Sequence, residues 1–126
     1  MTSTGAESGS YGGGIVGWSV ASSTSECVYS GTINTVKFIG GLIGLMDASS
    51  SISNCKVDGA TLTNSANTTA ADKTAPAALV SNAAAGATIS NCGVKVTLDG
   101  VAIDDVSSNM ITTDGGATVT GTYLIP

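Results

Sequence analysis

The chain has 126 residues and a net charge of −5, with four lysines and no histidine. Without a clustered basic face it is not expected to bind nucleic acid or an anionic membrane surface. Without an apolar run of about 18 residues it is not expected to insert in a membrane as a helix. Ile, Val and Leu recur at regular places, which indicates a packed core rather than disorder, and abundant Gly, Ser, Thr and Asn favour short strands over helices.

Residues 1–12 are polar and rich in glycine. They have neither the basic region nor the apolar region of a signal peptide. We therefore interpret them as a flexible lead-in or a partial coil. We also expect the chain to be a piece of an exported protein whose export signal lies outside it.

One pattern recurs along the rest of the chain. Its first marker is a large apolar residue, at Ile15, Leu42, Leu79 and Met110. Its second marker follows 12 or 13 residues later, as Cys27, Cys55, Cys92 and then Thr122. The first markers are 27, 37 and 31 residues apart, so the interior of each copy is nearly constant while the joins vary. Such spacing is typical of stacked units connected by surface loops, and the fourth copy matches the pattern least closely.

The copies predict one repeat domain over residues 13–126, with coils at about 13–38, 40–64, 77–100 and 107–124. Residues 63–76 lack an apolar pattern and are interpreted as an insertion that forms a surface loop. The first coil carries Trp18, Tyr29 and Phe38. These aromatic residues either form a platform on which sugars stack or cover the open end of the stack.

Two asparagines occupy one place in successive copies. Asn54 and Asn91 each precede a cysteine and are predicted to form the corner between two strands, since Asn tolerates the left-handed conformation. Their side chains are also expected to stack and bond to each other as an amide ladder. After this corner, residues 94–98 alternate between apolar and polar, and alignment of the coils would place Lys95 beside Asp58.

The three cysteines are interpreted as small buried apolar residues stacked in successive coils. Their number is odd, and no close pairs or histidines accompany them, so neither a full disulfide framework nor a zinc site is predicted. Stacked neighbours would lie about 4.8 Å apart, near the lower end of the range that a disulfide spans. One disulfide between two of the three therefore remains open.

The fold that accounts for this pattern is a parallel β-solenoid of about four coils. A copy of 25–30 residues is too small to bury its own apolar side chains, whereas stacking gives every coil a neighbour and produces one continuous core. An antiparallel sandwich also has short strands and frequent turns. It gives no reason for like residues at like offsets, so we place it second.

Residues 41–44 (Gly-Leu-Ile-Gly) and 52–55 (Ile-Ser-Asn-Cys), with Gly59 after them, resemble the GLUG repeat of bacterial surface proteins. Residues 14–17 (Gly-Ile-Val-Gly) are a second match, whereas the third copy has lost both flanking glycines. The resemblance implies a right-handed β-helix in a secreted or surface-anchored protein. Proteins with this repeat include adhesin-like proteins and the non-catalytic regions of some immunoglobulin-cleaving peptidases.

The chemistry available for catalysis is sparse. Without histidine, neither a serine or cysteine triad of the usual kind nor a histidine metal site can be assembled. Glycoside hydrolysis requires two carboxyl groups about 5–10 Å apart in a cleft. The acidic residues, which we interpret as solvated surface charge, are Glu7, Glu26, Asp47, Asp58, Asp72, Asp99, Asp104, Asp105 and Asp114. No catalytic, metal or cofactor residue is therefore predicted. Outward threonines at 32, 61 and 118 are a further place where ordered water or a sugar could bind.

These observations predict a non-enzymatic structural or adhesive segment of an exported bacterial surface protein, located outside the cell or on its surface. Its partner would be an unknown protein or glycan. A carbohydrate-processing β-helix and a scaffold region of a larger secreted peptidase are the alternatives. Because both ends of the stack would carry unpaired strand edges, we also expect end-to-end self-association or flanking domains.

Overall fold

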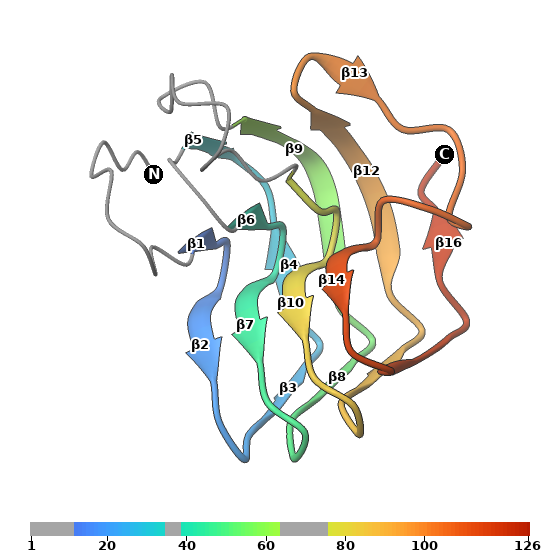
Figure 1. Ribbon diagram of the computed structural model, residues 1–126. Helices are drawn as coiled ribbons and strands as arrows, with labels where there is room; N and C mark the ends of the chain where they lie inside the picture. The colour runs from blue at the N-terminus through green and yellow to red at the C-terminus, as the bar shows by residue number, and fades with distance from the viewer. Residues whose placement is uncertain (1–11, 35–38, 64–75) are drawn as a thin grey trace.

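The computed structural model describes residues 12–34, 39–63 and 76–126. Within these ranges every regular element is a β-strand, and no helix is present (Figure 1). None of the described segments is thus a helix long and apolar enough to cross a membrane. Nearly all strand pairs are parallel, so the predicted all-β class with several parallel sheets is confirmed.

The first sheet, which we call sheet I, has four parallel strands. Their spatial order is β14 (Ile111–Asp114), β10 (Val80–Ala83), β7 (Ile43–Met46) and β2 (Val16–Ser19). The register aligns four residues across the sheet, namely Val16, Ile43, Val80 and Ile111. All four are β-branched, which suits the pleated surface of a strand.

Sheet II is built in the same way. Its spatial order is β15 (Thr118–Thr120), β11 (Thr88–Ser90), β8 (Ser51–Ser53) and β3 (Ser23–Ser25). All pairs are parallel. The central residues of the four strands align as one column, made of Thr24, Ile52, Ile89 and Val119.

Sheet III is centred on two long neighbours, β9 (Lys56–Thr63) and β12 (Gly93–Leu98). The outer edge of β9 pairs in parallel with β4 (Val28–Tyr29) and β5 (Thr32–Asn34). The outer edge of β12 pairs in parallel with β16 (Tyr123–Leu124) and antiparallel with β13 (Val101–Ala102). A small two-stranded sheet joins β1 (Gly12–Gly13) to β6 (Ile39–Gly40).

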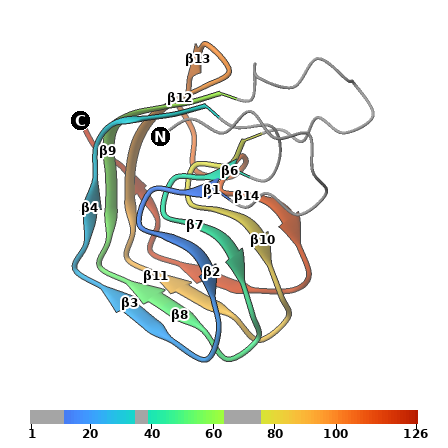
Figure 2. The same ribbon diagram turned by 90° about the vertical axis from the view of Figure 1, so that its left-hand side faces the viewer.

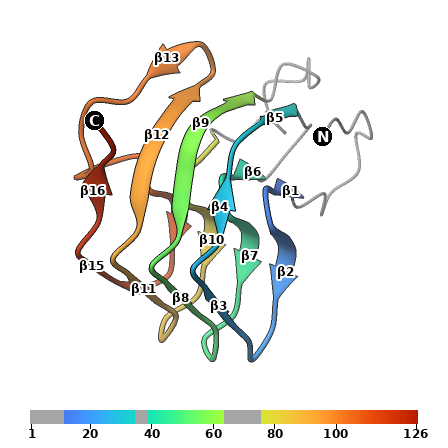
Figure 3. The same ribbon diagram turned by 180° about the vertical axis from the view of Figure 1, so that it is seen from behind.

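Four successive stretches of chain each supply strands to all three main sheets. We call them layer 1 (12–34), layer 2 (39–63), layer 3 (77–98) and layer 4 (110–124). Strand β13 lies on the same edge of β12 as β16, so it extends layer 4. Figure 2 shows the sheets on different sides of the molecule, and Figure 3 shows sheet III from behind, with β16, β12, β9 and β4 side by side.

The corner between sheets II and III has the same conformation in every layer. Its residues have φ between +53° and +67°, and they are Glu26, Asn54, Asn91 and Gly121. The left-handed conformation predicted for the two asparagines is therefore present. At the fourth place, a Cβ on Gly121 would require the side chain of Asn91 to move, because it would overlap Oδ1 of Asn91.

The corner between sheets I and II accounts for the difference of one residue between the copies. It contains three residues in layers 1 and 4, at 20–22 and 115–117, and four residues in layers 2 and 3, at 47–50 and 84–87. The strands before and after this corner remain in register across all four layers. The variation therefore stays on the surface and does not disturb the core.

The core is concentrated in the middle of the stack. The large side chains that are completely buried belong to layers 2 and 3, apart from Ile33 of β5. Among the described strands, those of layers 2 and 3 have a neighbour on both sides, whereas those of layers 1 and 4 have a neighbour on one side only. Burial of apolar surface is thus greatest where stacking is two-sided, as expected for units that cannot form a core alone.

The alternation predicted for residues 94–98 is confirmed. Val94, Val96 and Leu98 are buried, while Lys95 is exposed. Lys95 pairs in register with Asp58, as alignment of the coils predicts. The pairing then shifts by one residue, because layer 2 has an extra residue there, Gly59, with φ +76°.

Candidate functional site

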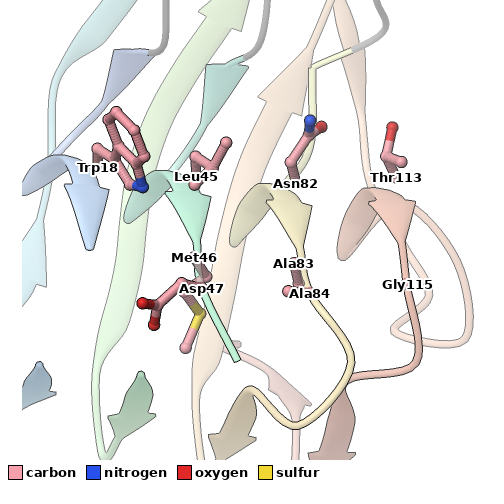
Figure 4. A pocket seen from close by; sticks show the side chains of 9 residues that line it. All are labelled: Trp18, Leu45, Met46, Asp47, Asn82, Ala83, Ala84, Thr113 and Gly115. Carbon is pink, nitrogen blue, oxygen red and sulfur yellow. The ribbon is translucent and has the colours of Figure 1, made fainter. Parts of the chain in front are cut away.

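Four outward side chains form a row across sheet I. They come from equivalent places in the four strands and are Trp18, Leu45, Asn82 and Thr113. Figure 4 shows them side by side, pointing away from the sheet. The row changes character along its length, from an indole through an aliphatic side chain to an amide and a hydroxyl. We call it the Trp18 row.

The Trp18 row forms part of an open cleft of about 340 Å³. The other residues of its wall are Met46, Asp47, Ala83, Ala84 and Gly115, which follow the row toward the corner with sheet II. Trp18 lies on the edge strand β2 and is 63% exposed, so one face of its ring is open to a ligand. A large exposed indole in an apolar cleft is typical of a binding surface.

Asp47 is the charged residue in this wall, and the local structure holds it in place. Its carboxylate accepts hydrogen bonds from Ala21 N at 3.1 Å, from Ser49 N at 3.0 Å and from the Ser50 hydroxyl at 2.8 Å. The Ser50 bond first, and then the Ala21 bond, hold the pKa of Asp47 below its ordinary value. Asp47 therefore ties the turn of layer 2 to layer 1 and remains ionised at neutral pH.

Asn82 carries a polar atom that the protein does not satisfy. Its Oδ1 is buried and has no hydrogen-bond partner, although the residue itself is partly exposed. A buried acceptor of this kind costs about 1–3 kcal/mol. A polar ligand in the cleft would therefore donate a hydrogen bond to this oxygen if the Asn82 amide rotated toward the ligand.

The structure brings the four apolar repeat positions together. Ile15 N donates to Leu42 O at 3.0 Å, Leu42 N to Leu79 O at 2.9 Å, and Leu79 N to Met110 O at 3.1 Å. Leu42 and Leu79 are completely buried, and Met110 is nearly so. Ile15 is 36% exposed, because layer 1 is paired on one side only among the described strands. These positions contribute to the core and lie away from the Trp18 row.

The cysteines also lie in one column. Cys27 O accepts from Lys56 N at 2.8 Å, and Cys55 O accepts from Gly93 N at 3.0 Å, so each cysteine is next to the following one. All three thiols are free, and Cys27 is the least buried. Burial first, then the charge of the neighbouring cysteine, raises the pKa of Cys55 and of Cys92.

The corner asparagines are exposed, and their role is conformational. Asn54 N donates to Ser90 O at 3.0 Å, and Asn91 N donates to Thr120 O at 2.9 Å. The predicted bond between the two amide side chains is not among the hydrogen bonds of the described residues. Because both side chains are exposed, such a bond would compete with water.

Two aromatic side chains of the first coil occupy separate places. Tyr29 packs partly buried against the core in sheet III, close enough to Gly14 that a Cβ there would overlap its ring. Trp18 points outward from sheet I. They form no common platform, and Trp18 alone belongs to the cleft. Phe38 and most of the predicted loop 63–76 lie outside the described residues.

The outward threonines of the sequence analysis lie in two different sheets. Thr32 and Thr61 are aligned neighbours in sheet III, together with Thr97 of layer 3. Thr118 lies in sheet II, where it pairs with Thr88. The reason is its position relative to the corner: Thr118 precedes the left-handed residue of its layer, whereas Thr32 and Thr61 follow theirs.

The acidic residues of the described ranges are spread over turns and strand surfaces. Asp105 accepts from the amide and hydroxyl of Ser107, and Asp114 accepts from the amides of Gly116 and Ala117. In the described part of the chain, no three His, Cys, Asp or Glu side chains gather closely enough to hold a metal ion. Glu7 and Asp72 lie outside the described residues.

Leu45, Asn82 and Thr113 were not predicted as site residues from the sequence. The signal was available, because each member of the Trp18 row follows the first marker of its copy by three residues. The register alone would have aligned them. Their exposure and their outward direction required the structure.

Comparison with family models, with curated proteins and with solved structures gave no match to this chain. The fold defines an all-β protein made of several parallel sheets. Its function must be inferred from the geometry of its surfaces.

Proposed function

We propose that this chain is a right-handed parallel β-helix of the GLUG-repeat kind, and that it serves as a non-enzymatic adhesive segment of an exported bacterial surface protein. The layer-by-layer pairing of the three sheets supports the β-helix. The match of residues 41–44 and 52–55 to the repeat supports the family and the location. The Trp18 row is proposed as its contact surface.

The ligand that the Trp18 row fits best is a neutral glycan. The flat face of a sugar ring stacks on an indole, while its hydroxyl groups pair with amides and hydroxyls such as those of Asn82 and Thr113. Neighbouring strands are about 4.8 Å apart, so the row offers a new side chain at roughly the spacing of successive sugar units. The carboxylate of Asp47 at the wall disfavours acidic sugars.

The observation that carries this proposal is the exposed indole of Trp18 within an aligned row that includes an unsatisfied amide oxygen. An exposed indole that lies within an apolar cleft, rather than singly on the surface, is a candidate contact for a ligand. The acids of the cleft offer no pair for glycoside hydrolysis: Asp47 is the one carboxylate that lines it among the described residues.

The test uses the fact that Trp18 is the sole tryptophan of the sequence. Titration with cello- and chito-oligosaccharides should shift its fluorescence, and Trp18→Ala should weaken retention on the matching insoluble polysaccharide at least about tenfold. Trp18→Phe should keep part of the binding. Val101→Ala, which removes an exposed apolar side chain elsewhere, is the matched control.

Two results would contradict the proposal. If neither sugar series alters the fluorescence and Trp18→Ala is retained as well as the parent, the row is not a glycan surface. If the protein releases new reducing ends from a glycan and one Asp→Asn substitution abolishes this, the carbohydrate-processing alternative replaces the adhesive one.

A further inference from the structure

We propose that two copies of this chain stack head to tail, with layer 4 of one molecule pairing in parallel with layer 1 of the next. The occupant of each open end is thus a second copy of the same chain. The proposal rests on the two end layers and is independent of what binds the Trp18 row.

Exposed apolar side chains are confined to the ends of the stack. Among the described residues, the large apolar side chains that are exposed are Ile15, Trp18, Val20 and Val28 of layer 1, and Val101, Val119, Tyr123 and Leu124 on the layer 4 side. The inward-facing members of this set have buried counterparts in layers 2 and 3, namely Leu42 and Leu79 for Ile15, and Ile52 and Ile89 for Val119. These inward side chains lack a neighbour on one side, and a further layer would cover them. Trp18 points outward from sheet I and is not part of this surface.

The backbone groups of the two ends are complementary. Inside the stack, each layer donates one backbone hydrogen bond to the layer that follows it in the sequence, as Leu42 N does to Leu79 O. It donates another to the layer that precedes it, as Lys56 N does to Cys27 O. In layers 4 and 1, the equivalent donors are Met110 N and Val28 N, and no described strand pairs with the outer side of either layer. Stacking would supply each with the carbonyl that the inner layers use.

The register of the junction follows from the register within the chain. Continuing the three sheets by one layer places Ile111 beside Val16 of the next molecule, Thr118 beside its Ser23 and Tyr123 beside its Val28. The same continuation places Thr122 next to Cys27 of the next molecule, at the following place in the cysteine column.

The end layers also match each other in shape and charge. Their corners between sheets I and II both contain three residues, whereas the inner layers have four. Layer 4 therefore fits layer 1 at this corner without the mismatch that exists between layers 1 and 2. In the junction, Asp114 lies beside Ser19 and Glu26 lies beside Gly121, so neither of these two acids faces another acid.

A pair of single-thiol variants tests the junction. Variant A carries Cys55→Ala and Cys92→Ala and keeps the thiol of Cys27. Variant B carries Cys27→Ala, Cys55→Ala, Cys92→Ala and Thr122→Cys. Each variant carries one thiol, so a disulfide can form only between two molecules. Positions 27 and 122 are three layers apart within one molecule, about 14 Å, so they come within disulfide distance only across a junction. Oxidised glutathione accepts the two electrons that are released when two thiols join.

Head-to-tail stacking predicts that an equimolar mixture of A and B gives the A–B disulfide almost exclusively, well above the half that random pairing of the two thiols would give; a random distribution would overturn the junction. A–A or B–B as the main product would overturn the proposed polarity. Because a heterologous contact does not close, the parent chain should also form species that grow with concentration in sedimentation velocity. A parent chain that stays monomeric at every concentration would overturn the proposal, even if a variant fails to fold.

A charge substitution separates specific stacking from general aggregation. Val119 points along the inward column of sheet II and is 36% exposed at the open end, so Val119→Lys leaves the charge solvated in the monomer but buries it in the junction. The concentration at which half of the chain associates should rise at least about tenfold. Thr120→Lys, on the outer side of the same strand, is the control and should change it little; equal effects would overturn the proposed register.

Discussion

The inward column of sheet II allows the value of two-sided stacking to be measured with related substitutions. Ile89 is completely buried between Ile52 and Val119, whereas Val119 has a neighbour on one side and is 36% exposed. Ile89→Ala removes three buried carbons, worth about 2.4 kcal/mol of transfer free energy at about 0.8 kcal/mol each. The cavity that remains raises the expected loss to about 3–4 kcal/mol.

Val119→Ala removes two carbons from a partly exposed side chain and leaves no enclosed cavity, so the expected loss is about 1 kcal/mol. Urea unfolding followed by far-UV circular dichroism measures both variants, with the slopes compared to check that the unfolded states are alike. If Val119→Ala costs as much as Ile89→Ala, or if Ile89→Ala costs less than about 1 kcal/mol, the layered core is refuted.

Three further substitutions probe other parts of the architecture. Gly41→Ala should lower the urea midpoint more than Gly100→Ala, because a Cβ at Gly41 overlaps a carbonyl oxygen of layer 3. A Cβ at Gly100 meets no other atom, so only its left-handed conformation costs stability, about 1–2 kcal/mol. Equal midpoints for the two variants would contradict this prediction. The lowered pKa of Asp47 means that its stabilisation is present above its ordinary pKa of 3.8 and is lost as pH falls through the lower folded value. Asp47→Asn should therefore flatten the acid side of the melting temperature against pH, and an unchanged profile would contradict it. In the folded protein, Cys27 should react with a disulfide reagent before Cys92, because Cys92 is buried and its pKa is raised. Mass spectrometry of the labelled peptides gives the order of reaction. Faster reaction of Cys92 would contradict the burial of its thiol in the core.

Part of the fold could be predicted from spacing alone. A period of two places alternate side chains on opposite faces, so the pattern of residues 94–98 was enough to assign the buried side of β12. Equal offsets from the first marker to the cysteine were enough to align Lys95 with Asp58. These predictions depend on local geometry that every layer shares, and they do not need the path of the chain between layers.

Other features depended on contacts that no single copy specifies. Thr118 was aligned with Thr32 by its surroundings in the sequence, yet it lies in another sheet because it precedes the corner. The antiparallel strand β13 arises from a join between copies, which carries no repeat signal. The Trp18 row was missed because its four side chains differ in chemistry, so their equal offsets were not marked by a shared residue type.

The sequence by itself determined which residues are equivalent, since like side chains recur at like offsets wherever they must pack on one another. It also determined two of the left-handed corners, at Asn54 and Asn91, because Asn tolerates that conformation and most residues do not. The same conformation at Glu26 had no such signal in the sequence. Only the tertiary structure decided which equivalent residues are covered and which are open. Burial depends on having a layer on each side, and that is a property of position in the stack rather than of any residue in it.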